Sequence, residues 1–300
     1  MTAMKDFKNL VELFSAIPDE QAAINYFRAI RWKNGEFCPY CGHDKIYSFS
    51  NGRSFKCADC RKRFSLRVGT IFEDSKIEIR KWLAAIWLIT NHKKGIASTT
   101  LATDIGVTQK TAWFMLHRLR HAARTRSFNR PLRGTVEVDE GYFGGKDKNK
   151  HKEKRGKTKK ALAVGILERG GELRLLPIDS TSQMRSEVLS HVRRGARLIS
   201  DETRVLQHLD ALYQRTTVNH SSGQYGDGGD GHTNTIEGVW ALIKRQIYGV
   251  HHWVSAKHLD RYLDECTWRY NRRVLKGAQR VAEFLTRVDG PLTYKQLVHG

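Results

Sequence analysis

Three acidic residues that lie far apart in the sequence could together bind divalent metal ions. The alternating run from Thr135 to Asp139 predicts a strand with its valines on one face and Asp139 on the other. A second short, apolar strand ends at Asp201, and Glu237 follows the predicted start of a helix at Asn234. Carboxylate oxygens are the ligands that Mg²⁺ prefers, and two such ions about 4 Å apart catalyse in-line phosphoryl transfer.

The predicted helix from Asn234 would direct its acid toward the strand ends. Glu237 and Lys244 are two helical turns apart and therefore share one stripe. An apolar stripe lies about 100° away around the helix; it comprises Ile236, Val239, Trp240, Ile243 and Ile247. This apolar stripe would dock the helix on a sheet and tip Glu237 toward the other two acids.

Each acid also has a purely structural interpretation. Asp139 could be a turn residue whose neighbour Glu140 is the metal ligand, and Asp201 could cap the helix that follows it. Asn234 and Glu237 have the spacing of a capping box with Asn234 at the N-cap. The order of strand acid, strand acid and helix acid is more informative than any single position, and it favours a metal site.

Four of the five cysteines form two C-x-x-C pairs. Two residues between thiolates let one turn direct both sulfurs at a single ion, and a hairpin between the pairs can bring the second pair to the same ion. We predict one structural Zn²⁺, bound by Cys38, Cys41, Cys57 and Cys60. His43 could replace one ligand, and reduced surface thiols or a redox pair are the alternatives. A closed four-thiolate site has no open position for catalysis.

Residues 98–120 have the pattern of a helix-turn-helix. Small Ala102 permits close contact between two helices, and Gly106 can adopt the left-handed conformation of the turn. The second helix would place Arg118 near DNA phosphates. To the major groove it would present Thr108, Gln109, Lys110 and Thr111. An ordinary helical hairpin is the alternative.

A series of short strands after residue 134 indicates a ribonuclease-H-like core. The expected strands cover residues 135–139, 161–167, 173–178, 197–201 and 216–218. The fold class is therefore α+β and multidomain, with a mixed five-stranded sheet in the core. The predicted domains are a helical segment 1–34, a zinc ribbon 35–68, a helix-turn-helix 76–126 and a catalytic domain 133–290.

The 300 residues include 52 Lys and Arg against 31 Asp and Glu, and this net charge of +21 favours a polyanionic partner such as nucleic acid. A basic stretch at residues 144–160 is either a solvated loop or a phosphate clamp. Its predicted DNA contacts are Lys148, Lys150, Lys154 and Arg155. No apolar run is long enough to span a membrane and no signal peptide is recognisable, which favours a cytoplasmic protein.

In five segments the sequence resembles bacterial insertion-sequence DDE transposases that carry an N-terminal zinc ribbon before a ribonuclease-H-like, integrase-type core. The segments are RWKNGEFCPYCGH, FKCADCRKRFSLRVGTIFEDS, VEVDEGYFGGK, LISDE and HTNTIEGVWALIKR. The resemblance implies that Asp139, Asp201 and Glu237 bind two catalytic Mg²⁺ ions, which Mn²⁺ can replace. It also implies that Lys244, with Arg245 beside it, holds a DNA phosphate.

The resemblance implies a DNA transposase that binds the terminal inverted repeats of its element, cleaves there, and joins the freed 3′-OH to target DNA. Some members of the family have Asn as the third residue, so Asn234 is the alternative to Glu237; a third anion neutralises a metal pair better than an amide. Holding two DNA ends implies a homodimer or a higher oligomer. A DNA-binding regulator with an idle core and a nuclease that does not join DNA are the other functions that stay open.

Overall fold

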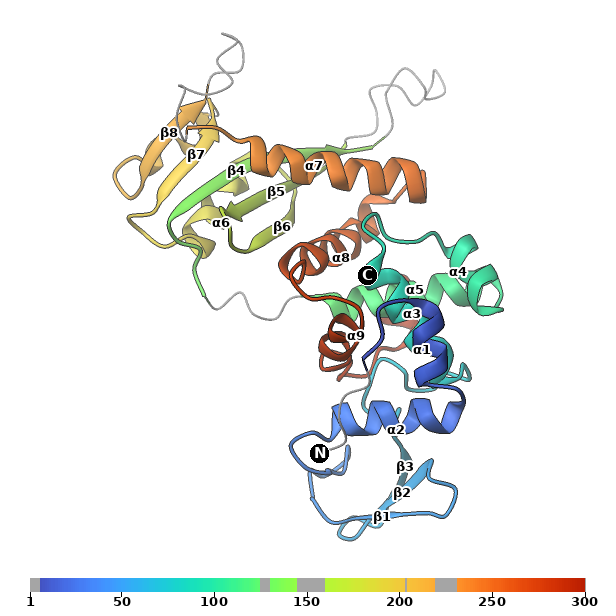
Figure 1. Ribbon diagram of the computed structural model, residues 1–300. Helices are drawn as coiled ribbons and strands as arrows, with labels where there is room; N and C mark the ends of the chain where they lie inside the picture. The colour runs from blue at the N-terminus through green and yellow to red at the C-terminus, as the bar shows by residue number, and fades with distance from the viewer. Residues whose placement is uncertain (1–5, 125–129, 145–159, 203, 219–230, 300) are drawn as a thin grey trace. The chain divides into compact units, whose positions relative to one another are not determined.

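The chain folds into two compact units, shown with all their elements in Figure 1. One unit joins residues 1–123 to residues 272–300, and the other comprises residues 124–271. In the part of the chain that the structure describes, no helix is both long enough and apolar enough to cross a bilayer. The described residues are 6–124, 130–144, 160–202, 204–218 and 231–299.

The first unit combines helices with a small antiparallel sheet. Its helices are α1 (Leu10–Ala16), α2 (Glu20–Arg31), α3 (Ile79–Asn91), α4 (Ser98–Ile105), α5 (Gln109–Ala123), α9 (Ala278–Leu285) and α10 (Tyr294–His299). Its strands, in spatial order, are β1 (Ile46–Ser48), β2 (Ser54–Cys57) and β3 (Arg63–Ser65). Because β2 ends at Cys57, the hairpin returns the second cysteine pair toward the first, as expected of the ribbon.

Helices α4 and α5 are joined by a tight turn at Gly106, which has φ 63° and ψ 59°. Glycine adopts this left-handed conformation without the steric cost that a Cβ atom imposes. Leu101 and Ala102 of α4 are buried, as are Ala112 and Met115 of α5. The apolar positions therefore hold the two helices together as the sequence pattern predicts.

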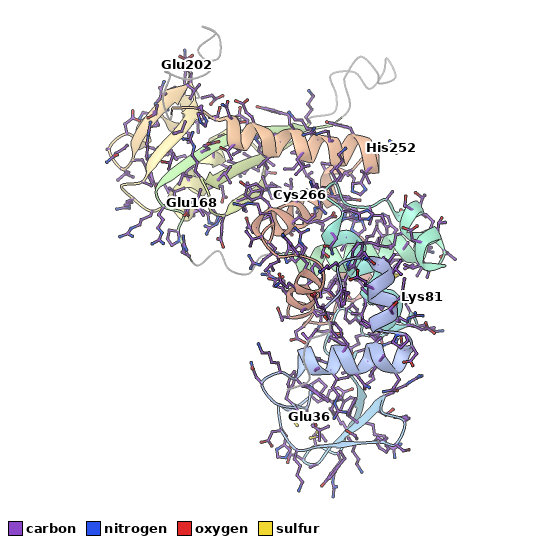
Figure 2. The ribbon with its side chains drawn as sticks, viewed as in Figure 1. Glu36, Lys81, Glu168, Glu202, His252 and Cys266 are labelled. Carbon is purple, nitrogen blue, oxygen red and sulfur yellow. The ribbon has the colours of Figure 1, made fainter. Side chains whose placement is uncertain are left out.

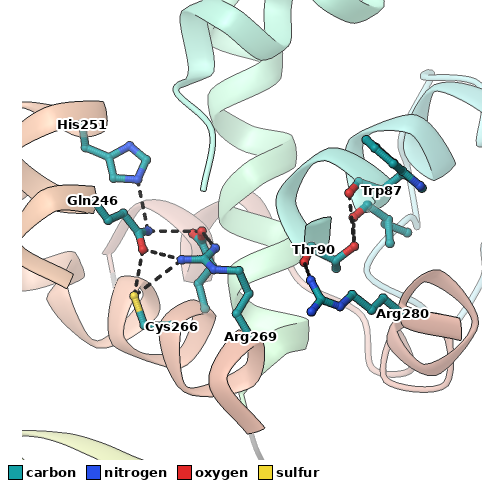
Figure 3. A network of polar contacts seen from close by, with 9 residues as sticks. Trp87, Thr90, Gln246, His251, Cys266, Arg269 and Arg280 are labelled. Atoms are coloured by element: carbon teal, nitrogen blue, oxygen red, sulfur yellow. Dashed lines mark hydrogen bonds and ion pairs between the residues drawn. The ribbon is translucent and has the colours of Figure 1, made fainter. Parts of the chain in front are cut away.

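Helix α9 belongs to the first unit although it follows the second unit in the sequence. It packs against α2 and α3, and its Phe284 and Leu285 are buried. Arg280 Nη1 donates a hydrogen bond of 2.8 Å to the carbonyl oxygen of Thr90 near the end of α3 (Figure 3). The domain expected over 133–290 is thus longer than the compact unit, which ends at residue 271, because α3 covers the apolar face of α9.

The second unit is built on the mixed five-stranded sheet that the sequence predicts. In spatial order its strands are β6 (Leu173–Ile178), β5 (Ala161–Glu168), β4 (Thr135–Phe143), β7 (Arg197–Asp201) and β8 (Gln214–Val218). The central strand β4 is antiparallel to β5 and parallel to β7. Val138 pairs with Ser200 of β7, and Asp139 lies opposite Gly165 of β5. This register brings Asp139 next to Asp201, the last residue of β7.

Different helices cover the two faces of this sheet. Helix α6 (Met184–His191), preceded by η3 (Thr181–Gln183), and η4 (Arg204–Leu209) pack on the face that carries Val136 and Val138. The other face is covered by α7 (Asn234–Gln246), η5 (Ile247–His251), η6 (Ala256–His258) and α8 (Leu259–Asn271). The predicted apolar stripe of α7 is confirmed, since the buried residues include Ile236, Val239, Trp240 and Ile243.

Two glycines let α7 approach the sheet closely. A Cβ atom added to Gly141 of β4 would lie 2.8 Å from Cζ3 of Trp240, and one added to Gly165 of β5 would lie 2.8 Å from Cζ2 of the same ring. Carbon atoms in contact are ordinarily about 3.5–4.0 Å apart. The absence of side chains at these two positions therefore sets the distance between α7 and the strand that carries Asp139.

We expect Gly165→Ala to destabilise the protein, because the rigid indole of Trp240 can make room only if α7 moves. Overpacking of this kind typically costs about 1–3 kcal/mol of unfolding free energy, which urea unfolding of the full chain measures. Gly238→Ala in α7 is the matched control. A Cβ atom there meets nothing within 4 Å, and alanine in place of a helical glycine stabilises by roughly 0.5–1 kcal/mol. Equal effects of the two substitutions would contradict the close contact.

Candidate functional site

Three carboxylates converge where β7 ends beside β4. One oxygen from each of Asp139, Glu140 and Asp201 lies within 4.8 Å of the others. Asp139 and Glu140 are consecutive on β4, and Asp201 immediately precedes Glu202, which Figure 2 labels at this edge of the sheet. The structure thus brings together two of the three predicted acids, and the third member of the cluster is Glu140, which the sequence offered only as an alternative.

Glu140 reaches this cluster from the opposite face of the sheet. Side chains alternate along a strand, so Asp139 shares the α7 side with Gly141, whereas Glu140 shares the α6 side with Val138. The ladder between β4 and β7 ends at Val138, which leaves the end of β7 open to the Glu140 carboxylate. Its Oε2 atom is buried and accepts no hydrogen bond from the residues that the structure describes.

Burial and repulsion between like charges raise the pKa of two members of this cluster. Burial has the largest effect on Asp139, and the charges of Asp201 and Glu237 add to it, so that its pKa is about 6. Burial, again followed by neighbouring carboxylates, raises the pKa of Glu140 to about 7. A bound divalent cation offsets this repulsion, and its preferred ligands are carboxylate oxygens. The donor set therefore fits a hard divalent cation.

Glu237 lies near the cluster without being one of its three members. It is in the first turn of α7, it is exposed, and Thr233 Oγ1 donates a hydrogen bond of 2.7 Å to its Oε1. Its charge still contributes to the raised pKa of Asp139.

Thr233 is the N-cap of α7 and Asn234 is the first helical residue. The capping box with Asn234 at the N-cap therefore does not form.

A fully buried acid that the sequence analysis did not single out, Glu137, lies two residues before Asp139. Arg169 Nε donates a hydrogen bond of 2.6 Å to Glu137 Oε1, and the backbone N–H of Ile236 donates one of 2.8 Å to Oε2. The sequence contains one signal for it: Glu137 and Asp139 are alternate residues of a strand and so share a face. The partners of Glu137 follow only from the tertiary structure.

The four predicted zinc ligands form a separate cluster in the first unit. Their sulfur atoms lie within 4.8 Å of one another, with 3.6 Å between Cys38 and Cys60 and between Cys41 and Cys57. Tetrahedral Zn²⁺ with Zn–S bonds of about 2.3 Å separates its sulfurs by about 3.8 Å. The four thiolates thus fit one ion, and His43 is not part of this cluster.

The predicted groove-binding residues lie at the start of α5. Thr108, Gln109 and Lys110 are exposed, and the Thr108 hydroxyl accepts a hydrogen bond of 3.2 Å from the N–H of Thr111, which caps the helix. Arg118 is directed into the protein, where Nη1 donates to the carbonyl oxygens of residues 71 and 73. Its guanidinium therefore has a structural partner in this unit.

The remaining predicted DNA contacts lie in the second unit. Lys244 and Arg245 are exposed in the last turn of α7, and Arg245 Nε donates a hydrogen bond of 3.1 Å to the carbonyl oxygen of Ala241. The basic loop falls outside the described residues, and with it Lys148, Lys150, Lys154 and Arg155.

Comparison with known proteins places the two units in one family. Residues 131–271 match the sequence profile of the ISXO2-like transposase domain, and residues 18–63 match that of the transposase zinc-ribbon domain. A protein in the transposable element ISH50 of Halobacterium salinarum is 30% identical over 266 residues, which cover 81% of this chain and 88% of that protein. The chain belongs to the ISXO2-like transposase family. The transposase domain profile ends at residue 271, as the second compact unit does.

A solved chain described as "Crystal structure of a pre-cleavage Mos1 transpososome" is also similar. It is 14% identical, the match covers 70% of this chain and 79% of that chain, and the TM-score is 0.25. Membership of the transposase family rests on the sequence matches alone. These matches confirm the predicted resemblance to insertion-sequence transposases with an N-terminal zinc ribbon.

We expect Cys38→Ser to lose the bound zinc and to unfold the ribbon, because three thiolates and a hydroxyl bind Zn²⁺ far more weakly than four thiolates. Metal analysis of the purified protein should show about one zinc per chain before the substitution and almost none after it. Cys266→Ser is the matched control, since Cys266 lies in α8 outside the cluster. Full zinc content in Cys38→Ser would contradict the four-thiolate site.

We expect Asp139→Asn to stabilise the protein in buffer without Mg²⁺, because it removes a buried charge from a crowded anionic cluster. The folded-state pKa of Asp139, about 6, exceeds its ordinary value of 3.8, so the cost of ionisation is absent below pH 4 and complete above pH 6. Urea unfolding should show a gain of about 3 kcal/mol at pH 8 that shrinks toward pH 4.

Asp210→Asn provides the control for this measurement. Asp210 belongs to the same unit and accepts a hydrogen bond of 2.6 Å from Arg215 Nε, so its removal should be neutral or slightly destabilising. A gain at pH 8 from Asp210→Asn as large as that from Asp139→Asn would show that the effect comes from net charge and not from the cluster.

Proposed function

We propose that the chain is the transposase of an insertion sequence, which cleaves DNA at the ends of its element and joins the freed 3′-OH groups to target DNA. The observation that carries the proposal is the convergence of Asp139, Glu140 and Asp201 in a chain of the ISXO2-like transposase family. A protein that only binds DNA gains nothing from buried carboxylates that repel one another and the DNA phosphates.

Asp139 and Asp201 would hold two Mg²⁺ ions, or Mn²⁺ in their place, with Glu237 as the third ligand and Glu140 as a further oxygen donor. Bound ions supply electrostatic stabilisation to the attacking and leaving oxygens of the phosphoryl transfer. The chain's own part is to fix the donors: Asp139 is on the central strand, and its Oδ1 accepts a hydrogen bond of 2.9 Å from the N–H of Glu140. Asn234, exposed at the start of α7, is the alternative third ligand.

Exposed cations on α7 would bind the DNA backbone beside the acids. Lys244 lies on the same helical stripe as Glu237, about 10 Å farther along the axis, and Arg245 follows it. A phosphate held there would leave the neighbouring phosphodiester free to reach the carboxylates. Contacts of this kind release counterions, so binding of the DNA should weaken steeply as salt is raised.

Recognition of the terminal inverted repeats would come from the first unit. The exposed start of α5 would enter the major groove through Thr108, Gln109, Lys110 and Thr111, as in a helix-turn-helix. The zinc ribbon would add further backbone contacts, and the net charge of +21 favours double-stranded DNA as the partner. Two element ends and a target in one reaction call for a homodimer or a higher oligomer.

A supercoiled donor plasmid that carries the inverted repeats flanking the gene tests this function. With Mg²⁺, the full zinc-loaded chain should cut the donor at the repeat ends and produce joined products. Asp201→Asn should lower the cleavage rate by more than about 100-fold, the upper limit for loss of an outer-shell partner, and should leave binding of the repeats in a gel shift unchanged. Asp179→Asn, an exposed acid after β6, is the control that should cleave normally.

Each alternative function predicts a different result in this assay. Binding of the repeats without any cleavage by the unsubstituted chain would indicate a regulator. Cleavage without joined products would indicate a nuclease. Cleavage that survives Asp201→Asn would place the reaction elsewhere in the chain.

A further inference from the structure

Glu137 is a buried carboxylate whose two oxygens are both used inside the protein. Its side chain has no exposed surface. Oε1 accepts the hydrogen bond from Arg169 Nε, and Oε2 accepts the one from the backbone N–H of Ile236. A buried carboxylate is costly unless it is paired and hydrogen-bonded, and here both conditions are met. Glu137 is not part of the acidic cluster and both of its oxygens have partners within the protein, so its role differs from that of Asp139.

The partners of Glu137 all lead to the start of α7. Ile236 is the third residue of that helix, and its N–H is one of the donors that a helix leaves unsatisfied at its N-terminus. Arg169 Nη2 donates to the carbonyl oxygen of His232, just before the helix, and lies 3.0 Å from His232 Nδ1. The negative charge of Glu137 also complements the positive end of the helix dipole. Glu137 and Arg169 therefore join β4 to the first turn of α7.

We infer that Glu137 is a positioning residue for the metal site, an inference that rests on the proposed function. Ile236 is the residue before Glu237, and Glu137 lies two residues before Asp139 on the same face of β4. The hydrogen bond between Glu137 and Ile236 therefore connects the two elements within two residues of each acid. It fixes the rotation and height of α7, and with them the place of Glu237 relative to Asp139.

The other end of α7 is held by a similar network that lies far from the acids. Gln246 is buried; its Nε2 donates to Glu265 Oε1 over 3.2 Å, and its Oε1 accepts hydrogen bonds from Arg269 and from the Cys266 thiol (Figure 3). Ten residues of helix, about 15 Å, separate Gln246 from Ile236. Substitution of Gln246 therefore provides a control that loosens the same helix at the end that is far from the acids.

Binding of Mn²⁺ to the full zinc-loaded chain, titrated well below its unfolding temperature, tests the inference. Glu137→Gln should weaken Mn²⁺ binding by roughly 10–100-fold, as loss of an outer-shell partner does, while Gln246→Met should lower the unfolding temperature and leave Mn²⁺ affinity unchanged. Equal Mn²⁺ affinity of Glu137→Gln and the unsubstituted chain would overturn the inference, and so would equal losses in both variants.

A double substitution shows whether Glu137 acts through Glu237. If it does, Glu137→Gln combined with Glu237→Gln should bind Mn²⁺ no more weakly than Glu237→Gln alone; losses that add would overturn the inference. Should Glu137→Gln fail to fold, Arg169→Lys keeps the buried charge compensated but cannot bind Glu137 and His232 together. It should weaken Mn²⁺ binding, by less than the roughly 10–100-fold that complete loss of an outer-shell partner costs, and a folded Arg169→Lys with unchanged affinity would again overturn the inference.

Asp139→Asn in the same titration separates this inference from the proposed function. If Asp139→Asn binds Mn²⁺ as well as the unsubstituted chain, the metal site itself is wrong and the proposed function fails with it. If Asp139→Asn loses Mn²⁺ binding and Glu137→Gln keeps it, the metal site stands and only the positioning role of Glu137 is wrong.

Discussion

Repulsion between like charges in a partly buried cluster of carboxylates is the constraint on which the rest of this structure depends. Asp139, Glu140 and Asp201 present oxygens within 4.8 Å of one another, and the pKa values of Asp139 and Glu140 lie well above their ordinary range. Such a cluster opposes folding when its carboxylates are ionised and no cation is bound. The surrounding structure must therefore hold the carboxylates by other means, and it does so by placing two of them on the central strand of the sheet, with pairing strands on both sides. The acidic cluster lowers the stability of the folded protein, and it does so at the position where the proposed chemistry needs negative charge.

The position of α7 is fixed at three points along its length, each by a different interaction. At its start, the Glu137 carboxylate accepts the N–H of Ile236; in its middle, Trp240 lies on the glycines of β4 and β5; at its end, Gln246 is bound within a buried polar network. The close packing of Trp240 sets the separation of helix and sheet, but an apolar contact would still allow the helix to slide along the sheet. The hydrogen bond of Glu137 is directional, so it also fixes the rotation of the first turn, whereas the contacts of Gln246 hold only the end of the helix that is far from the acids.

What could be predicted from the sequence follows from how local each feature is. The C-x-x-C spacing and the strand acids Asp139 and Asp201 are each recognised from a few adjacent residues, and the structure brings each set together, although β4 continues past Asp139 to Phe143. The sequence offered Glu140 as an alternative to Asp139, but the presence of both in one cluster could not be predicted, because strand alternation assigns Glu140 to the opposite face and only the early end of the β4–β7 ladder lets it reach the aspartates. The membership of α9 in the first unit could not be predicted either, since an amphipathic helix does not reveal which surface covers it.

Two glutamates of one strand show that the surroundings of a carboxylate decide its role. Glu137 and Glu140 are three residues apart on β4 and are indistinguishable by type. The oxygens of Glu137 meet a guanidinium and a helix N-terminus, so its charge is fully compensated inside the protein. Glu140 Oε2, although buried, accepts no hydrogen bond from the described residues, and the charges nearest to it are carboxylates of its own sign. A buried anion that the fold compensates holds the fold together; a buried anion that the fold leaves uncompensated takes up a proton or, in the proposed function, a bound cation. The second condition, and not the number of acids, distinguishes a metal site from an ion pair.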